Sequence, residues 1–175
     1  MRKIRALLWL SLALALVSCA GAPLRTSQTL QPAAAVDTQR FLGTWHIIAH
    51  IPYWPERGKV ATRVEYVARA DGRVDDLYYF RDTLDGPEQR WEGVAWPLDS
   101  SGARWKARFI WPFSTEFWVV EVDADYQLAL IATPDAELAW VYARSPQLDD
   151  ESYAAALARL QALGVDSTRL QRIPR

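Results

Sequence analysis

Short runs in which apolar and polar residues alternate, separated by closely spaced turn residues, fill this chain from residue 40 to residue 144. A period of two residues is typical of a strand with one buried face, whereas a helix repeats every ~3.6 residues. The breaks carry residue types that favour turns, at 70–72, 85–87, 99–102, 124–125 and 134–135. The pattern predicts an all-β domain of antiparallel strands.

Eight candidate strands follow one another, and one helix comes after them. The strands are predicted at 40–52, 60–69, 73–81, 89–96, 103–111, 115–123, 127–133 and 137–144. The helix is expected from the apolar stripe of Tyr153, Ala156, Leu157, Leu160 and Leu163. Asp149 or Asp150 can cap it and Gly164 can end it, and 168–173 is a candidate for a last short strand. Consecutive hairpins favour an eight-stranded up-and-down barrel, and a Greek-key sandwich is the alternative.

The composition narrows the class of protein further. The chain has 175 residues, of which 50% are hydrophobic, with 9 Trp and 1 Cys. This is enough apolar material for one domain with a core, and a single Cys excludes a disulfide scaffold and a four-cysteine zinc site. The formal net charge of -1 gives no basic surface for a phosphate backbone, so no nucleic-acid partner is expected.

The N-terminus has the organisation of an export signal. A basic start with Arg2, Lys3 and Arg5 is followed by an apolar run over 6–17 and then by small residues. The run is shorter than the ~20 residues that a membrane-spanning helix needs. We therefore expect a signal peptide at 1–18, a flexible linker at 19–38 and the barrel domain at 39–175.

The string Leu16, Val17, Ser18, Cys19, Ala20 resembles the lipobox of bacterial lipoproteins. The resemblance implies cleavage before Cys19 and acylation of its sulfur, which would anchor the protein in a membrane. In that class Asp after the Cys retains a lipoprotein in the inner membrane, so Ala20 implies the outer membrane, with the domain facing the periplasm. The alternative is an ordinary secretory signal whose Cys falls near the cut.

Three further strings stand out: Gly43, Thr44 and Trp45 after a short turn, the segment from Asp123 to Tyr126, and Arg144 before the helix. In this order they resemble the three lipocalin signatures, the second without its usual triplet. The strings at 56–58 and 111–113 resemble the bacterial outer-membrane branch of this family. The resemblance implies a barrel with the helix outside it and structural roles for Gly43, Trp45, Asp123 and Arg144, with Arg144 stacked on Trp45 at the closed end.

The same resemblance implies the function. It points to a carrier of a small hydrophobic ligand, a fatty acid or lysophospholipid, for storage, transport or repair in the cell envelope. No enzymatic activity, cofactor or metal is expected, since the known enzymatic lipocalin uses a cavity thiol and the only Cys here would be acylated. A homodimer is left open.

Alternation predicts which side chains face the interior and so contact the ligand. The predicted set is Ile47, Ala49, Ile51, Val64, Tyr66, Tyr78, Phe80, Trp91, Gly93, Trp105, Ala107, Phe109, Trp140 and Tyr142, and the predicted mouth residues are Tyr53, Trp54, Trp111 and Phe113. Small residues among large rings favour a ligand cavity. The alternative is that the rings fill the barrel.

Asp76 also falls on the inward side, where an unpaired carboxylate is costly. It lies near the mouth, partners a tyrosine, or marks a bulge that changes the register. An isomerase-like enzyme using Asp76 with Tyr78 or Tyr66 is therefore an alternative function.

A haem or tetrapyrrole carrier is another alternative, although this register points His46 and His50 outward. The two histidines lie ~13 Å apart along a strand, too far to share a metal.

Overall fold

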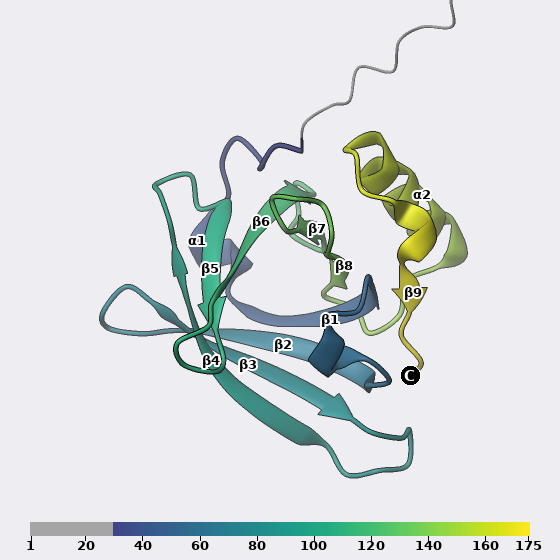
Figure 1. Cartoon of the computed structure of the whole chain (residues 1–175). Coiled ribbons are helices and arrows are strands. Elements are labelled where there is room, and N and C mark those ends of the chain that lie inside the picture. Colours follow the sequence, from purple (N-terminus) through teal and green to yellow (C-terminus); the bar gives the residue numbers. More distant parts are fainter. Residues whose placement is uncertain (1–29) are drawn as a thin grey trace, which may run out of the picture.

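The computed structural model describes residues 30–175, and its strands close into a barrel (Figure 1). The strands are β1 (Gly43–His50), β2 (Val60–Ala68), β3 (Val74–Arg81), β4 (Gln89–Pro97), β5 (Arg104–Arg108), β6 (Thr115–Val122), β7 (Leu128–Ala132) and β8 (Ala139–Ala143). Each pairs antiparallel with the next, and β1 pairs with both β2 and β8, which closes the sheet. The predicted eight-stranded up-and-down barrel is confirmed.

The chain before β1 is packed against the barrel rather than extended as a strand. The N–H of Ala33 donates to the carbonyl of Val119, and Leu30 and Val36 are buried. The short helix α1 (Thr38–Phe41) follows, capped by the Asp37 carboxylate. Residues 30–38, which the sequence assigns to a linker, are therefore in contact with the domain. The predicted signal peptide and Cys19 lie outside the described residues.

The long helix α2 (Asp150–Ala162) lies beside the barrel wall (Figure 1). The Asp149 carboxylate accepts a hydrogen bond from the N–H of Ser152 and caps its start, as the sequence predicts. The buried face of α2 packs on the outward side chains of β1, β6, β7 and β8. This second core contains Ile48, Val120, Leu130, Val141, Ala156, Leu160 and Val165. No helix among residues 30–175 has the length and apolar character required to cross a bilayer.

The inward register of β1 changes halfway along the strand. Ile47 pairs with Tyr142 but Ala49 pairs with Val141, so one extra residue is accommodated between them. Beyond this bulge Ala49 and Ile51 face the second core under α2. The prediction that these two residues line the interior is wrong. His50, predicted to point outward, instead shares the inner face with its partner Trp140.

The predicted fifth strand is too long at its C-terminal end. β5 stops at Arg108, and Phe109 begins a loop with its side chain 40% exposed. Its ring nevertheless covers Gly93, because a Cβ at Gly93 would lie 2.8 Å from Cδ1 of Phe109. Gly93 is therefore small because an aromatic ring occupies the space beside it, and the prediction that Gly93 leaves room for a ligand is wrong.

The C-terminal segment completes the wall where β1 and β2 separate. Strand β9 (Gln171–Arg172) follows the short helix η2 (Ser167–Arg169) and pairs with β1. A second short helix, η1 (Trp54–Glu56), lies in the loop between β1 and β2. The carbonyl of Pro174 accepts a hydrogen bond from the N–H of Ala61 on β2. The Arg175 guanidinium donates to the carbonyls of Ile47, at 2.7 Å, and Thr62, at 2.9 Å. Backbone groups that the diverging strands leave unpaired are thus satisfied by the end of the chain.

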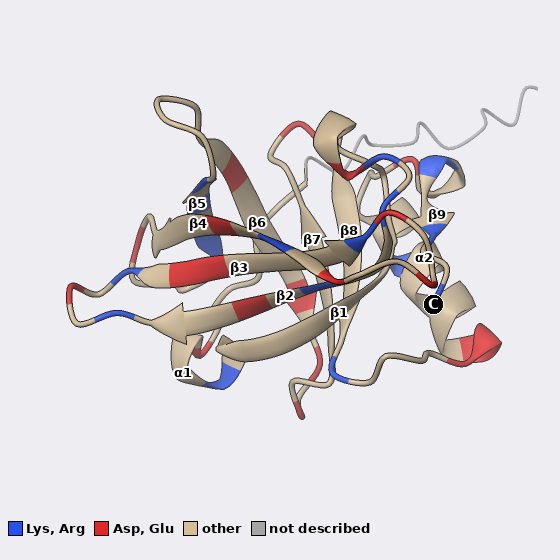
Figure 2. Cartoon of the chain, turned by 90° about the horizontal axis from the view of Figure 1, so that it is seen from below, with Lys and Arg blue, Asp and Glu red and all other residues tan. Residues whose placement is uncertain are grey.

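Charged residues of both signs are interspersed along the strands and loops of the described chain (Figure 2). Several form ion pairs, such as Arg63 of β2 with Glu88 in the loop before β4, and Arg69 just after β2 with Asp75 of β3. Their distribution matches the expectation that the outer face of the barrel meets water.

Candidate ligand-binding site

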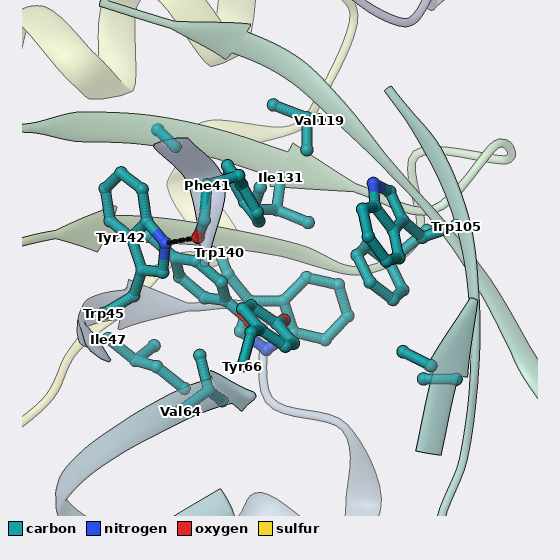
Figure 3. Packing of buried hydrophobic residues seen from close by; sticks show 14 of the residues in the cluster. Phe41, Trp45, Ile47, Val64, Tyr66, Trp105, Val119, Ile131, Trp140 and Tyr142 are labelled. Atoms are coloured by element: carbon teal, nitrogen blue, oxygen red, sulfur yellow. Dashed lines mark hydrogen bonds between the residues drawn. The ribbon is translucent and has the colours of Figure 1, made fainter. Parts of the chain in front are cut away.

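The closed end of the barrel is filled by Trp45. Its side chain is fully buried, and its Nε1 donates a 2.8 Å hydrogen bond to the carbonyl of Phe41 (Figure 3). The guanidinium carbon of Arg144 lies 3.8 Å from the centroid of the Trp45 ring system. Arg144 also donates to four backbone carbonyls, those of Arg40, Leu42, Thr44 and Tyr126. These contacts anchor the start of β1 to the end of β8.

Two other signature residues have local structural roles. Gly43 adopts a φ of 86°, which glycine reaches without strain, directly beside the Arg144 side chain. The Asp123 carboxylate accepts hydrogen bonds from the N–H groups of Gln127 and Leu128, at 2.7 and 2.9 Å. It thereby holds the turn between β6 and β7. None of these groups faces the interior where a ligand would lie.

Between Trp45 and the open end, the inward side chains form one continuous apolar cluster (Figure 3). Of the predicted ligand-contacting residues, it contains Ile47, Val64, Tyr66, Tyr78, Phe80, Trp105, Ala107, Trp140 and Tyr142, with Trp91 packed against it and only partly buried. It also contains residues that were not predicted as site residues, among them Val74, Phe117, Val119, Ile131 and Ile173. Most of these occupy positions that strand alternation alone would have identified.

Aromatic rings stack along the wall formed by β3 and β4. The rings of Tyr78 and Trp91 are parallel within 14°, with centroids 5.3 Å apart, and the rings of Phe80 and Trp91 have centroids 4.4 Å apart. The Lys59 ammonium lies 4.5 Å from the centroid of Phe80 and pairs with Asp82. This arrangement puts a cation at the rim, above the aromatic wall.

Polar groups interrupt the apolar interior. Asp76 is 4% exposed and faces inward between its strand partners Tyr66 and Gly93. No described residue donates a hydrogen bond to its Oδ1, and the buried hydroxyls of Thr62 and Tyr78 also lack partners. The three groups lie at different levels of the barrel, since Asp76 pairs with Tyr66, Tyr78 pairs with Val64, and Thr62 comes two residues before Val64. None of the three explanations that the sequence leaves open for Asp76 holds. Asp76 lies beside Tyr66 toward the closed end rather than near the mouth, no change of register separates it from its strand partners, and no tyrosine donates a hydrogen bond to its Oδ1.

Burial controls the ionisation of this region. It raises the pKa of Asp76 to about 7, and the negative charge of nearby Glu56 adds to the increase. Burial also raises the pKa values of Tyr66, Tyr78 and Tyr142 above the usual tyrosine value. These three hydroxyls are therefore protonated at neutral pH and can both donate and accept hydrogen bonds.

A second carboxylate reaches this interior from the loop between β1 and β2. The Oε2 atom of Glu56 accepts a 3.1 Å hydrogen bond from Nε1 of Trp140 and lies 3.1 Å from Nδ1 of His50. The Glu56 side chain is only 12% exposed. Sequence reasoning missed both His50 and Glu56 as interior residues. The bulge concealed His50, and no local pattern indicates that the loop turns Glu56 inward.

The predicted mouth residues lie in loops at one end of the barrel. Antiparallel connectivity brings the β1–β2 and β5–β6 loops to the same end. Tyr53 and Trp54 belong to the first loop and Trp111 and Phe113 to the second, and they range from 39% to 79% exposed. Ile110 adds a further exposed apolar side chain. The open end therefore presents aromatic surface to the surroundings.

Two surface depressions lie outside the barrel and do not belong to this site. One, of about 470 Å³, borders Pro146, Leu148 and the C-terminal segment. The other, of about 500 Å³, crosses the outer faces of β3, β4 and β5 next to Asp75 and Arg108. Neither is lined by Thr62, Asp76 or Tyr78. Among residues 30–175, no group of three His, Cys, Asp or Glu side chains is arranged to hold a metal ion.

Comparisons with known proteins agree with this geometry. The family model described as a lipocalin-like domain matches residues 36–175. The chain is 30% identical over 151 residues to temperature-induced lipocalin-1 of Arabidopsis thaliana, covering 79% of each chain. It is 31% identical over 135 residues to the outer membrane lipoprotein Blc of Citrobacter freundii, covering 77% of this chain and 76% of the relative.

Solved structures share the same fold at lower identity. Insecticyanin from the tobacco hornworm Manduca sexta aligns with a TM-score of 0.66 and 19% identity, covering 83% of this chain and 84% of that chain. Lobster apocrustacyanin A1 aligns with a TM-score of 0.63 and 16% identity, covering 84% of this chain and 91% of that chain. At these identities the alignments concern the fold alone.

Proposed function

Because this chain belongs to the lipocalin family, in the branch of the Blc outer-membrane lipoproteins, we propose that it binds a fatty acid or lysophospholipid inside its barrel. The family is known for binding small hydrophobic ligands. The observation that carries the proposal is the continuous aromatic and aliphatic interior, which ends at the partly buried Trp91 below loops with exposed aromatic residues. Transfer of the ligand's hydrocarbon from water supplies the affinity, at about 25 cal/mol per Å² of buried apolar surface.

We further propose that the protein is a carrier without catalytic activity, for storage, transport or repair of envelope lipids. Acylation of Cys19 would hold it at the outer membrane with the barrel in the periplasm. Bacterial relatives named outer membrane lipoproteins support this location. Replacement of Cys19 by Ser should abolish incorporation of labelled palmitate and release the protein from the outer-membrane fraction. Labelling that survives this substitution contradicts the proposed anchor.

Calorimetric titration of the purified protein with palmitate and with palmitoyl lysophosphatidylcholine tests the binding function. We expect saturable binding at one site for at least one of the two lipids. Ala107→Leu adds volume to the interior and should weaken that binding, whereas Lys106→Leu, one residue away on the outer face, should leave it unchanged. Absence of saturable binding for both lipids contradicts the proposal.

The open question of a homodimer is addressed by sedimentation of the same preparation. Each barrel has its own interior, so the proposed binding function does not require a dimer. A monomer that binds lipid leaves the carrier function intact.

A further inference from the structure

We propose that one edge of β4 pairs antiparallel with the same edge of a second copy of this chain, so that two barrels associate side by side about a two-fold axis next to Trp91. We call residues 89–93, on the side of β4 that faces β5, the free edge. The proposal concerns the outside of the sheet and does not depend on the lipid inside the barrel.

The pairing of β4 with β5 covers only part of β4. The last partners are Val94 and Arg108, because β5 ends at Arg108 while β4 begins at Gln89. The chain then leaves the sheet through residues 109–114, and among residues 30–175 no backbone hydrogen bond joins this loop to β4. A strand edge without a partner is a template for pairing with another chain.

The neighbouring hydrogen bonds identify which backbone groups lie on the free edge. The N–H of Leu98, just after β4, donates to the carbonyl of Arg104 on β5. Backbone groups of an antiparallel strand alternate in direction, so those of Glu92 and Arg90 point the same way as those of Leu98. Glu92 and Arg90 therefore direct two N–H and two C=O groups away from β3.

The surface beside this edge is hollowed. The depression of about 500 Å³ on the outer faces of β3, β4 and β5 is bordered by Arg90, Glu92 and Gly93 and by Arg108 at the end of β5. The side chains of Arg90 and Glu92 are exposed and form an ion pair with each other. This part of β4 is therefore accessible to a strand from outside.

The charges on the free edge are self-complementary in one register. When two copies pair antiparallel with their Trp91 residues opposite each other, Arg90 of each copy lies opposite the partner's Glu92. Registers centred on Arg90 or on Glu92 place like charges opposite each other, which is destabilising. The register centred on Trp91 also aligns the residues whose N–H and C=O groups point outward, as an antiparallel ladder requires. A second copy is therefore the partner that this edge fits.

The loop beside the free edge supplies apolar contact area. Ile110, Trp111 and Phe113 are 66%, 79% and 75% exposed. In the proposed pair the partner's β3–β4 turn, which carries the exposed Leu84, lies against this loop. Trp111 and Phe113 of both copies can together bury roughly 600 Å². Added to the paired strands, this approaches the ~1,000 Å² of a specific interface, so we expect association at micromolar concentration.

Sedimentation velocity of the purified protein, from low to high micromolar concentration, tests the proposal. A reducing buffer prevents a disulfide through Cys19. We expect a shift from monomer to dimer as the concentration rises. Arg90→Glu and Glu92→Arg each place like charges opposite each other at two positions, so each variant alone should self-associate about tenfold more weakly or less.

An equimolar mixture of the two variants is the decisive sample. It restores opposite charges at both positions of the ladder, so the mixture should form a heterodimer although neither variant dimerises well alone. Recovery in the mixture also shows that both variants are folded. Each charge reversal tests the edge separately, so if one variant does not fold, the other still provides the test.

Asp125→Arg is the matched control, because it reverses one exposed charge in the turn between β6 and β7 and should leave self-association unchanged. A protein that stays monomeric over this concentration range overturns the proposal. A dimer that neither charge reversal weakens, or a mixture that associates no better than its components, overturns it as well. Lipid binding is measured separately by calorimetry, so each of these results leaves the proposed function in place.

Discussion

The carboxylate of Glu56 accepts a hydrogen bond from the indole nitrogen of Trp140, which joins the β1–β2 loop to β8 across the open end of the barrel. The same oxygen lies 3.1 Å from Nδ1 of His50. One buried side chain therefore positions the loop that carries Tyr53 and Trp54. We therefore expect access to the interior to depend on how firmly this loop is held.

Removing this anchor should loosen the loop without unfolding the barrel. In Glu56→Ala the Trp140 and His50 nitrogens lose a common acceptor, so amide hydrogens of residues 51–59 should exchange faster. Hydrogen exchange read by mass spectrometry measures this change. The adjacent Arg57 is exposed, and Arg57→Ala should leave the exchange rates unchanged. Equal acceleration in both variants would show that the loop does not depend on Glu56.

The stacking of Arg144 on Trp45 predicts a stability effect that charge alone does not explain. Arg144→Lys keeps the positive charge but loses the planar group that covers the ring and reaches four backbone carbonyls. We expect a loss of about 2 kcal/mol in the free energy of unfolding, measured with urea. Arg108→Lys is the control, since its guanidinium carbon lies 5.7 Å from the Trp96 ring, and should cost less than about 0.5 kcal/mol.

Asp76 makes the stability of the ligand-free protein depend on pH. Its pKa is about 7 in the folded protein and near the usual aspartate value of 3.8 in the unfolded chain, so the folded state binds more protons between these two values. Stability should therefore fall as pH rises from about 4 to about 7, by at most about 4 kcal/mol from this group.

Comparison with Asp76→Asn isolates that contribution. The variant cannot ionise at this position. The Tm of the variant minus the Tm of the unaltered protein should therefore be larger at pH 8 than at pH 5. Thermal unfolding followed by circular dichroism gives both differences. A Tm difference between the two proteins that is the same at both pH values would mean that Asp76 does not change ionisation on folding.

The contact between Gly93 and Phe109 predicts a pair of substitutions with non-additive effects. Gly93→Ala places a methyl group 2.8 Å from the Phe109 ring and should destabilise the barrel by about 1 to 2 kcal/mol. Phe109→Ala removes the obstructing ring, so adding Gly93→Ala to that variant should cost less. A double-mutant cycle in urea measures the coupling, and additive effects would contradict the observed contact.

Much of this architecture was predictable because period-two patterning is strong in most strands. In β5 the charged Arg104, Lys106 and Arg108 alternate with buried Trp105 and Ala107, and nothing obscures the register. The same logic failed in β1. Ile47, Ile48 and Ala49 are all apolar, so the sequence does not mark the extra residue that turns His50 inward.

The remaining errors arise where tertiary contacts override local pattern. Phe41 sits in a four-residue helix rather than a strand, since Asp37 caps the turn and the Phe41 ring packs 5.1 Å from Trp45. Glu56 belongs to a loop, and a loop side chain that folds back into a barrel leaves no periodic signal. The lack of a partner for Asp76 is likewise visible only when all surrounding strands are in place.

Heavy-atom quenching of tryptophan fluorescence tests the central claim that a lipid binds inside the barrel. A fatty acid brominated at mid-chain quenches tryptophans that it contacts. We predict saturable quenching that persists in the double variant Trp54→Phe/Trp111→Phe, because Trp91, Trp105 and Trp140 remain around the interior. Quenching that disappears in this double variant would place the lipid on the exposed aromatic loops and contradict an interior site.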